Sequence, residues 1–192
     1  MKAIMISIQP QCVEKILNGI KTIEIRKTMP KCELPCKVYI YCTKGKKLYK
    51  CVSNFDEDLL NGKVVAEFTI NKVDILERDL NDWLPKNRYD ISNELLKNIN
   101  LNQEQLWNYG QGKTLYAWHI DNLKIYDKPK ELSEFSHFIP NNKCPTKQCG
   151  TNCEDCPNYD EEHETCLALY YAHREIKQPP QSYCYVEELE DE

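Results

Sequence analysis

Long hydrophobic runs are absent from this sequence of 192 residues. Its first ten residues, MKAIMISIQP, contain no apolar segment of the length found in signal peptides. No later segment approaches the roughly 20 apolar residues that a membrane-spanning helix needs. Internal repeats and low-complexity segments are also missing from the sequence. We therefore expect a cytoplasmic protein that does not enter a membrane.

An overall excess of positive charge, which is typical of general nucleic-acid-binding proteins, is also lacking, because the net charge is −5. The charges are nevertheless unevenly distributed. Residues 15–50 contain ten lysines and arginines and only two acids, a net charge of +8, against −13 for the remainder. This distribution favours a local anionic ligand over the wrapping of a long duplex. Exposed lysines that only maintain solubility are the alternative explanation.

The composition, with 41% hydrophobic and 29% charged residues, is ordinary for one globular domain with a core and an insertion. Residues 3–8 alternate between isoleucines and other side chains, which predicts a half-buried strand. Pro10 suits the first turn of a helix, and Gly19 suits the left-handed position just beyond its end. The chain is therefore predicted to begin with a strand, a helix and a second strand.

Further strands are predicted wherever apolar and polar residues alternate, at residues 22–26, 38–42, 63–74, 114–120, 123–126 and 181–187. In the long strand 63–74, alternation places Glu67 on the outward face and, on the inward face, Val64, Ala66, Phe68 and Ile70. Segment 78–110 has helical spacing instead, which predicts short helices at 92–98 and 102–109. Its tryptophans are interpreted as core residues rather than as base-stacking platforms.

The most informative segment is residues 19–26, GIKTIEIR, a turn glycine followed by a short strand. Its two isoleucines point one way, while Glu24 and Arg26 point the other way and Lys21 lies where the turn meets the strand. An amine, a carboxylate and an anion-binding guanidinium so close together are typical of a polar cleft. A solvated strand face with an ordinary ion pair is the alternative.

The pattern Gly-x-Lys-x-x-Glu-x-Arg, preceded by Ser7-Ile8-Gln9-Pro10 and a short helix, resembles the signature of the ASCH domain. The closing run Pro180-Gln181-Ser182-Tyr183 resembles the end of such proteins. The resemblance implies an α+β fold, a PUA-like small β-barrel with flanking helices. The barrel would comprise residues 1–140, including the helical segment 78–110, and residues 167–192, with a Cys-rich metal-knuckle insertion at 141–166.

The resemblance also implies a cleft for RNA or a modified nucleotide, lined by Lys21, Glu24 and Arg26. Arg26 would hold a phosphate or a carbonyl group through a bidentate contact. Glu24 would orient Arg26 or accept a hydrogen bond from a base amino group. Lys21 would contact phosphate or act as a base. Further ligand contacts would come from residues at the ends of the neighbouring strands, namely Ser7, Gln9, Ser182 and Tyr183.

Some small bacterial ASCH proteins resemble amidohydrolases that remove the acetyl group of N4-acetylcytidine, using the lysine of this motif, a threonine and a separate glutamate. Here Glu24 occupies the place of the threonine, and a carboxylate does not replace a hydroxyl in acyl transfer. Hydrolysis would instead require Lys21 to activate water while Glu24 or Glu67 transfers protons. Other members resemble ribonucleases, but no histidine lies beside the motif.

The sequence is therefore compatible with three functions. The preferred one is a module that binds RNA or a modified nucleotide, supported by the basic segment and the glutamate form of the motif. The second is a small hydrolase of the amidohydrolase or ribonuclease kind, supported by the retained Lys21. The third is a protein-interaction adaptor.

Cysteine, in contrast, is abundant, with 11 residues, an odd number that favours thiols and metal ligands over disulfides in a reducing compartment. Four of them fall within thirteen residues, at Cys144, Cys149, Cys153 and Cys156. Four thiolates satisfy a tetrahedral structural Zn²⁺ site. An iron–sulfur cluster is the first alternative and disulfides are the second. Since residues 140–165 contain almost no apolar side chains, this insertion would depend on a metal or cross-links to fold.

Overall fold

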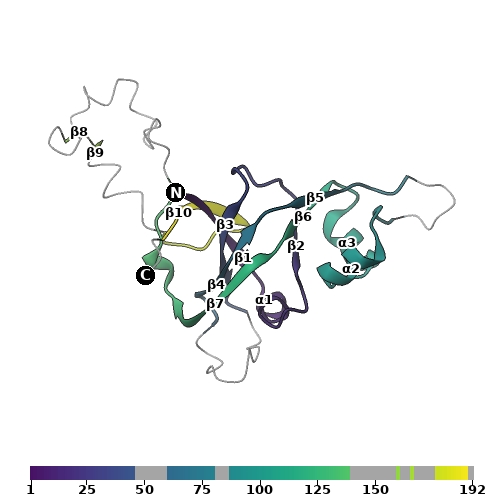
Figure 1. Ribbon diagram of the computed structural model, residues 1–192, viewed down its shortest axis with the longest axis horizontal. Coiled ribbons are helices and arrows are strands. Elements are labelled where there is room, and N and C mark those ends of the chain that lie inside the picture. The colour runs from purple at the N-terminus through teal and green to yellow at the C-terminus, as the bar shows by residue number, and fades with distance from the viewer. Residues whose placement is uncertain (46–59, 81–86, 139–158, 161–164, 167–175, 190–192) are drawn as a thin grey trace.

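The computed structural model describes residues 1–45, 60–80, 87–138, 159–160, 165–166 and 176–189 (Figure 1). The helices are α1 (Pro10–Leu17), α2 (Asn93–Ile99), α3 (Gln103–Gly110) and a short 3-10 helix (Leu132–Glu134). The strands are β1 (Lys2–Ile8), β2 (Ile23–Arg26), β3 (Cys36–Cys42), β4 (Val64–Ile70), β5 (Val73–Leu76), β6 (Leu115–His119), β7 (Asp121–Lys130), β8 (Tyr159–Asp160), β9 (Thr165–Cys166) and β10 (Tyr183–Glu187). The mixed α+β class predicted from the sequence is confirmed.

Two main sheets carry the fold. One has five strands in the order β10-β1-β3-β4-β7, and the other has three strands in the order β2-β6-β5. The β1–β3 pairing is parallel, and all other pairings within these two sheets are antiparallel. A small third sheet pairs β8 with β9.

The two main sheets share one long bent ribbon instead of closing into a barrel. β4 pairs with β7 in the first sheet, and their continuations β5 and β6 pair in the second. Residues 71–72 and Ile120 lie between the strands at the bend. On the other side, no backbone pairing between strands joins β2 to β1 or β10 among the described residues. The small closed barrel that the resemblance implies is therefore replaced, in this part of the chain, by two open sheets.

The five-stranded sheet is buried on both faces, so the prediction of a half-buried first strand is wrong. On one face Ile4 and Ile6 pack with Phe68 and the α1 residues Val13 and Ile16. The opposite face belongs to a second core, formed by Ala3, Met5, Tyr39, Tyr41, Val64, Tyr126, Phe135, Ile176 and Val186. Met5 and Ile4 are equally inaccessible, at 0% exposed. Residues distant in sequence form this second core, so the alternation within residues 3–8 does not predict that both faces of the strand are buried.

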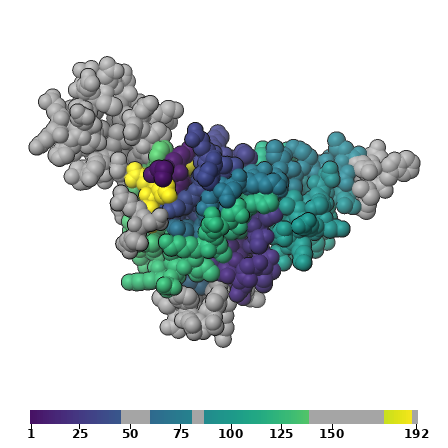
Figure 2. All heavy atoms as spheres, viewed as in Figure 1, coloured from purple at the N-terminus to yellow at the C-terminus, as the bar shows by residue number. Residues whose placement is uncertain are grey.

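Two helices cover one face of the three-stranded sheet, where Figure 1 shows α2 and α3 beside β2 and β6. Ile23 and Ile25 pack there against Ile99 and Leu106. Ser92 caps α2, and Asn102 forms a capping box with Gln105 at the start of α3, so both predicted helices are confirmed to within a residue. Figure 2 shows the teal atoms of this helical segment and the yellow atoms of β10 on opposite sides of the described part of the chain.

The predicted long strand at 63–74 is divided into β4 and β5 and contains an irregularity. The register between β4 and β7 shifts between Val64 and Ala66. As a result Val64 packs in the second core and Val65 in the first. The inward placement predicted for Ala66, Phe68 and Ile70 is confirmed, and that of Val64 is wrong because a shift of one residue reverses the face.

None of the helices in the described part of the chain has the length and apolar character required to cross a membrane.

Candidate functional site

Three charged side chains are buried together at the sequence motif. Lys21 is 5% exposed, Glu24 is 8% exposed and Arg26 is 7% exposed. They come from the turn after α1 and from β2, as alternation along the strand predicts. This degree of burial excludes the alternative of a solvated strand face. We call these three residues the charged cluster.

Glu24 connects the two cations of the charged cluster. Its Oε2 lies 3.4 Å from Lys21 Nζ, and its Oε1 lies 3.2 Å from Arg26 Nη2. Lys21 Nζ also donates a hydrogen bond of 3.0 Å to the carbonyl oxygen of Ile99. That carbonyl is at the C-terminal end of α2, where the last carbonyl groups of a helix lack partners within the helix and favour a cation.

Arg26 spans the open side between the two main sheets. Its Nη2 donates to the carbonyl oxygen of Ser7 at 3.1 Å, and its Nη1 approaches the carbonyl oxygen of Ser182 at 3.5 Å. Ser7 is in turn fixed to the segment before β10, because its backbone N–H donates to Ser182 and its hydroxyl donates to the carbonyl oxygen of Pro180 at 2.6 Å. A guanidinium side chain thus joins β2 to β1 and β10 where strand pairing does not.

The local sequence explains how Lys21 reaches the charged cluster. Gly19 ends α1 with a positive φ of 69°, a conformation that glycine adopts without strain. The N–H groups of Ile20 and Lys21 then both donate to the carbonyl oxygen of Lys15. Thr22 donates to the carbonyl oxygen of Asn98, which directs the chain past the end of α2 and into β2.

Two buried donors at this site have no acceptor within the described protein. They are Nε of Arg26 and the indole Nε1 of Trp118. Trp118 is 0% exposed and lies directly opposite Glu24 in the β2–β6 register, so the two side chains share one face of the sheet with Arg26. A buried donor without a partner costs about 1–3 kcal/mol. An oxygen acceptor from a ligand or a water molecule would relieve this cost.

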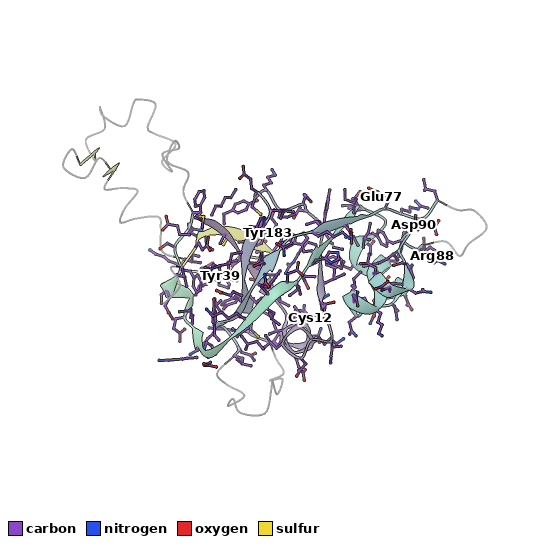
Figure 3. The ribbon with its side chains drawn as sticks, in the orientation of Figure 1. Cys12, Tyr39, Glu77, Arg88, Asp90 and Tyr183 are labelled. Carbon is purple, nitrogen blue, oxygen red and sulfur yellow. The ribbon has the colours of Figure 1, made fainter. Side chains whose placement is uncertain are left out.

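Tyr109 and Cys12 lie close to the charged cluster, although sequence reasoning did not place them there. Burial raises the pKa of the Tyr109 phenol, which is also within electrostatic reach of Arg26 and Glu24. Burial and the Glu24 carboxylate raise the pKa of the Cys12 thiol, against the opposing effect of nearby cations. Figure 3 shows Cys12 on α1 and Tyr183 on β10. Nothing in the sequence indicates that the end of α3 approaches β2.

The other predicted ligand contacts have different positions. Ser7 joins the charged cluster through its carbonyl group, and Ser182 does so through its backbone rather than its exposed side chain. Gln9 is exposed before α1 and accepts a hydrogen bond from Gln11. Tyr183 packs edge-on against Trp118, with 5.7 Å between the ring centroids.

Glu67 is not brought to the charged cluster. It lies opposite Tyr39, on the face of the five-stranded sheet that carries the second core. Its carboxylate accepts a hydrogen bond of 2.6 Å from the Tyr126 hydroxyl and lies 3.8 Å from Lys124 Nζ. Trp118, which is opposite Glu24, belongs to the first core on the other face of that sheet. A proton-transfer role beside Lys21 therefore has no geometric support.

The four cysteines of the predicted metal site, Cys144, Cys149, Cys153 and Cys156, lie outside the described residues. Zinc, with an iron–sulfur cluster as the alternative, stays a prediction from their spacing. Among the described residues, no group of three or more histidine, cysteine or acidic side chains could hold a metal ion. Two surface hollows, of about 450 and 990 Å³, are lined by residues outside the charged cluster.

The two sheets and flanking helices define the class of protein: the chain has the ASCH fold, as the motif at residues 19–26 predicts. It is similar to crystal structures of ZmASCH from Zymomonas mobilis. A tyrosine-to-phenylalanine mutant superimposes with a TM-score of 0.51 at 17% identity, over 97% of this chain and 91% of that one. A serine-to-alanine mutant gives a TM-score of 0.50 at 16% identity, over 96% and 88%. No protein-family model and no curated protein sequence matches the chain.

Proposed function

We propose that this protein binds RNA or a modified nucleotide, with the ligand held at the charged cluster of Lys21, Glu24 and Arg26. The observation that carries this proposal is the pair of buried donors, Arg26 Nε and Trp118 Nε1, which have no acceptor in the described protein. Phosphate and nucleobase carbonyl oxygens are acceptors of the kind that such donors bind.

The residues of the charged cluster have different roles in the proposed binding. Two contacts of Lys21 are to Ile99 and Glu24, so its main contribution is to hold the carboxylate in place. Arg26 is the contact residue, because its Nε has no acceptor in the described protein while its Nη groups fix the plane of the guanidinium. A planar, fixed guanidinium recognises an oxygen acceptor with more geometric specificity than a flexible ammonium does.

The surroundings of the charged cluster suit a single nucleotide better than a long duplex. The site is buried, and Tyr109 beside it is 38% exposed and can present an aromatic ring to a base. Lys27, whose Nζ lies 4.8 Å from the Tyr109 ring centroid, is exposed and available for a phosphate. Binding that includes such a phosphate contact weakens as salt concentration rises.

The test measures binding of a panel of nucleosides, nucleotides and short RNAs at low salt, by calorimetry or fluorescence anisotropy. The decisive variant is Arg26→Lys, which keeps the charge and removes the Nε donor. We expect at least about a tenfold loss of affinity, the equivalent of one charge-assisted hydrogen bond. Lys124→Ala is the matched control, because it removes the cation beside Glu67, away from the charged cluster. Equal affinity of wild type and Arg26→Lys, or no binding to any probe, would contradict the proposal.

A hydrolase is the second candidate, favoured by the buried amine–carboxylate contact of Lys21 and Glu24 at 3.4 Å. Because Glu67 is remote, Glu24 is the carboxylate that would transfer protons beside Lys21. The test incubates N4-acetylcytidine with wild type and Lys21→Ala and analyses the products by chromatography and mass spectrometry. Cytidine released by wild type alone would identify an amidohydrolase, whereas recovery of the intact nucleoside would leave the binding function.

A further inference from the structure

A lysine whose contacts are all with neutral groups lines the larger of the two surface hollows. Lys2 is half-buried at the start of β1, and its Nζ donates a hydrogen bond of 2.6 Å to the carbonyl oxygen of Lys31. The same Nζ lies 3.9 Å from the ring centroid of Tyr185 and 5.9 Å from that of Phe138. Among the described residues, no carboxylate forms an ion pair with this ammonium group. Lys2 is therefore held in a defined position without a counter-charge.

Tyr185 does not supply the missing negative charge. Burial raises the pKa of its phenol to about 12, so the hydroxyl is neutral near pH 7. The phenol oxygen accepts a hydrogen bond of 2.9 Å from the backbone N–H of Lys31, which holds the loop before β3 against β10. The ring and the loop together fix the ammonium of Lys2 in place, and an anion from outside the described chain would complete its surroundings.

The hollow beside Lys2 has the size and the charge of a site for an anionic ligand. Its volume of about 990 Å³ is at the upper end of the range of small-molecule sites, which is about 300–1,000 Å³. Lys37 is paired with Glu188 at 3.0 Å, so these two lining residues add no net charge. The other charged side chains of the lining leave a positive surplus, and they are Lys2, Lys31 and Glu33.

Phe138 adds an aromatic ring to the lining of this hollow. The residue is half-buried, and its backbone N–H donates to the carbonyl oxygen of Tyr185 at 3.0 Å, which attaches it to β10. An aromatic ring beside cations is the combination by which proteins hold single-stranded nucleic acid, because bases stack on the ring and phosphates contact the cations. The lining therefore favours a nucleotide unit over a simple inorganic anion.

The hollow is also close to the charged cluster along the chain. Arg26 ends β2, and Lys31 follows it by five residues, so their Cα atoms are at most about 18 Å apart. Neighbouring nucleotides of a stacked strand are about 3.4 Å apart along its axis, so about five steps cover this distance. One short strand of RNA is therefore long enough to reach both places.

We propose that the hollow is a second nucleotide subsite for single-stranded RNA, in which a phosphate contacts Lys2 and a base stacks on Phe138 while another nucleotide of the strand occupies the charged cluster. This inference rests on the proposed function and extends it from one nucleotide to a strand of about six. A duplex does not suit the hollow, because its paired bases are already stacked on one another and do not reach the ring.

The experiment compares ligands of two lengths on the full chain. Binding of the monophosphates and the homohexamers of adenosine, cytidine and uridine is measured by calorimetry over a series of salt concentrations. We expect the best hexamer to bind wild type at least about fivefold more tightly than its monophosphate, which is the factor expected for one additional stacked base.

Two variants test the two contacts. Lys2→Gln removes the charge and keeps a donor for the carbonyl oxygen of Lys31. Its plot of log affinity for the hexamer against log salt concentration should be shallower by about 0.7, which corresponds to one phosphate contact. Phe138→Leu should lose the advantage of the hexamer over the monophosphate. Neither variant should change the affinity for the monophosphate, and Lys124→Ala, which lies in the other hollow, should change neither affinity.

The results distinguish failure of this subsite from failure of the proposed function. If no monophosphate and no hexamer binds, both proposals are overturned. Equal affinities of wild type for hexamer and monophosphate would overturn the subsite alone, and so would an unchanged salt dependence in Lys2→Gln. A loss of monophosphate affinity in Phe138→Leu as large as the loss of hexamer affinity would show that the ring supports the fold, and would also overturn the subsite.

Discussion

Glu24 and Glu67 each lie beside a lysine, but the two lysines differ in their exposure to solvent. Their side chains are 11% and 13% exposed, and each lies near a lysine ammonium. Lys21 beside Glu24 is 6% exposed, whereas Lys124 beside Glu67 is 62% exposed. At Glu24 both signs of charge have been removed from water, and at Glu67 only the carboxylate has.

This difference separates a structural contact from a candidate binding site. Burying both ions of a pair costs free energy of solvation that their attraction only partly offsets. A buried ion pair is therefore weak evidence for stability, and this is consistent with the proposal that the charged cluster binds a ligand. An ion pair with an exposed lysine contributes little to stability either way.

Glu24→Gln should produce the largest loss of stability. It leaves the ammonium of Lys21 and the guanidinium of Arg26 buried without a counter-charge, which typically costs about 3–5 kcal/mol. Urea unfolding, with an unchanged m-value, measures the change. Glu67→Gln is the matched control and should lose less, because the cation it leaves behind is in water. Equal losses in the two variants would remove the distinction between the two glutamates.

Tyr126→Phe should have an intermediate effect. It removes the hydroxyl that donates to Glu67 at 2.6 Å and leaves the packing of the ring in the second core largely unchanged. Hydrogen bonds to charged groups contribute about 1.5–3 kcal/mol, so we expect a loss near the lower limit because Lys124 still accompanies the carboxylate. Thermal or urea unfolding checks the value. A change within experimental error would mean that water replaces the hydroxyl.

Asp74 provides a third carboxylate, whose effect appears only in acid. Burial alone would raise its pKa, but hydrogen bonds from Lys72 and His119 hold the pKa of Asp74 below the ordinary value of 3.8. A lowered pKa in the folded state means that the unfolded state binds the proton first as pH falls. The stabilisation is therefore present above about pH 4 and is lost as pH falls through the lower, folded pKa.

Urea unfolding of wild type and Asp74→Asn across this acid range tests the effect. As the solution is acidified, the unfolding free energy of the wild type should approach that of the variant. The unfolding free energy of the variant should depend less steeply on pH. Parallel curves for the two proteins would show that Asp74 does not contribute to acid sensitivity.

Lys124→Ala should have the smallest effect. The ion pair is long, at 3.8 Å, and the lysine is 62% exposed, so the expected change in unfolding free energy is within about 0.5 kcal/mol. Ligand affinity at the charged cluster should also be unaffected. A loss of affinity in this variant would show that the ligand also contacts the region around Lys124 and Glu67.

The parts of the fold that the sequence predicts are those governed by local rules. Pro10 and Gly19 define the ends of α1, and Ser92 and Asn102 define the starts of α2 and α3. Alternation along β2 correctly places Glu24 and Arg26 on one face. These features depend on capping, turn conformation and strand geometry, all of which act within a few residues.

The parts that the sequence does not predict depend on contacts between distant residues. Alternation assigns Glu67 to one face of its strand, but it does not reveal which face meets β2. Met5 is buried by Phe135 and Val186, which lie far along the chain. Tyr109 approaches Arg26 only because α3 packs over the three-stranded sheet. Each of these positions is determined by tertiary packing.

The pairing of β10 with β1 has a consequence for the order in which the protein is made. Arg26 and Ser7 emerge early from the ribosome, but the carbonyl groups of Ser182 and Pro180 that they contact are synthesised much later. A nascent chain that ends before residue 180 has the charged cluster without these partners. Because non-local contacts of this kind form slowly, the complete set of contacts around the charged cluster should arise only after residue 182 has been synthesised.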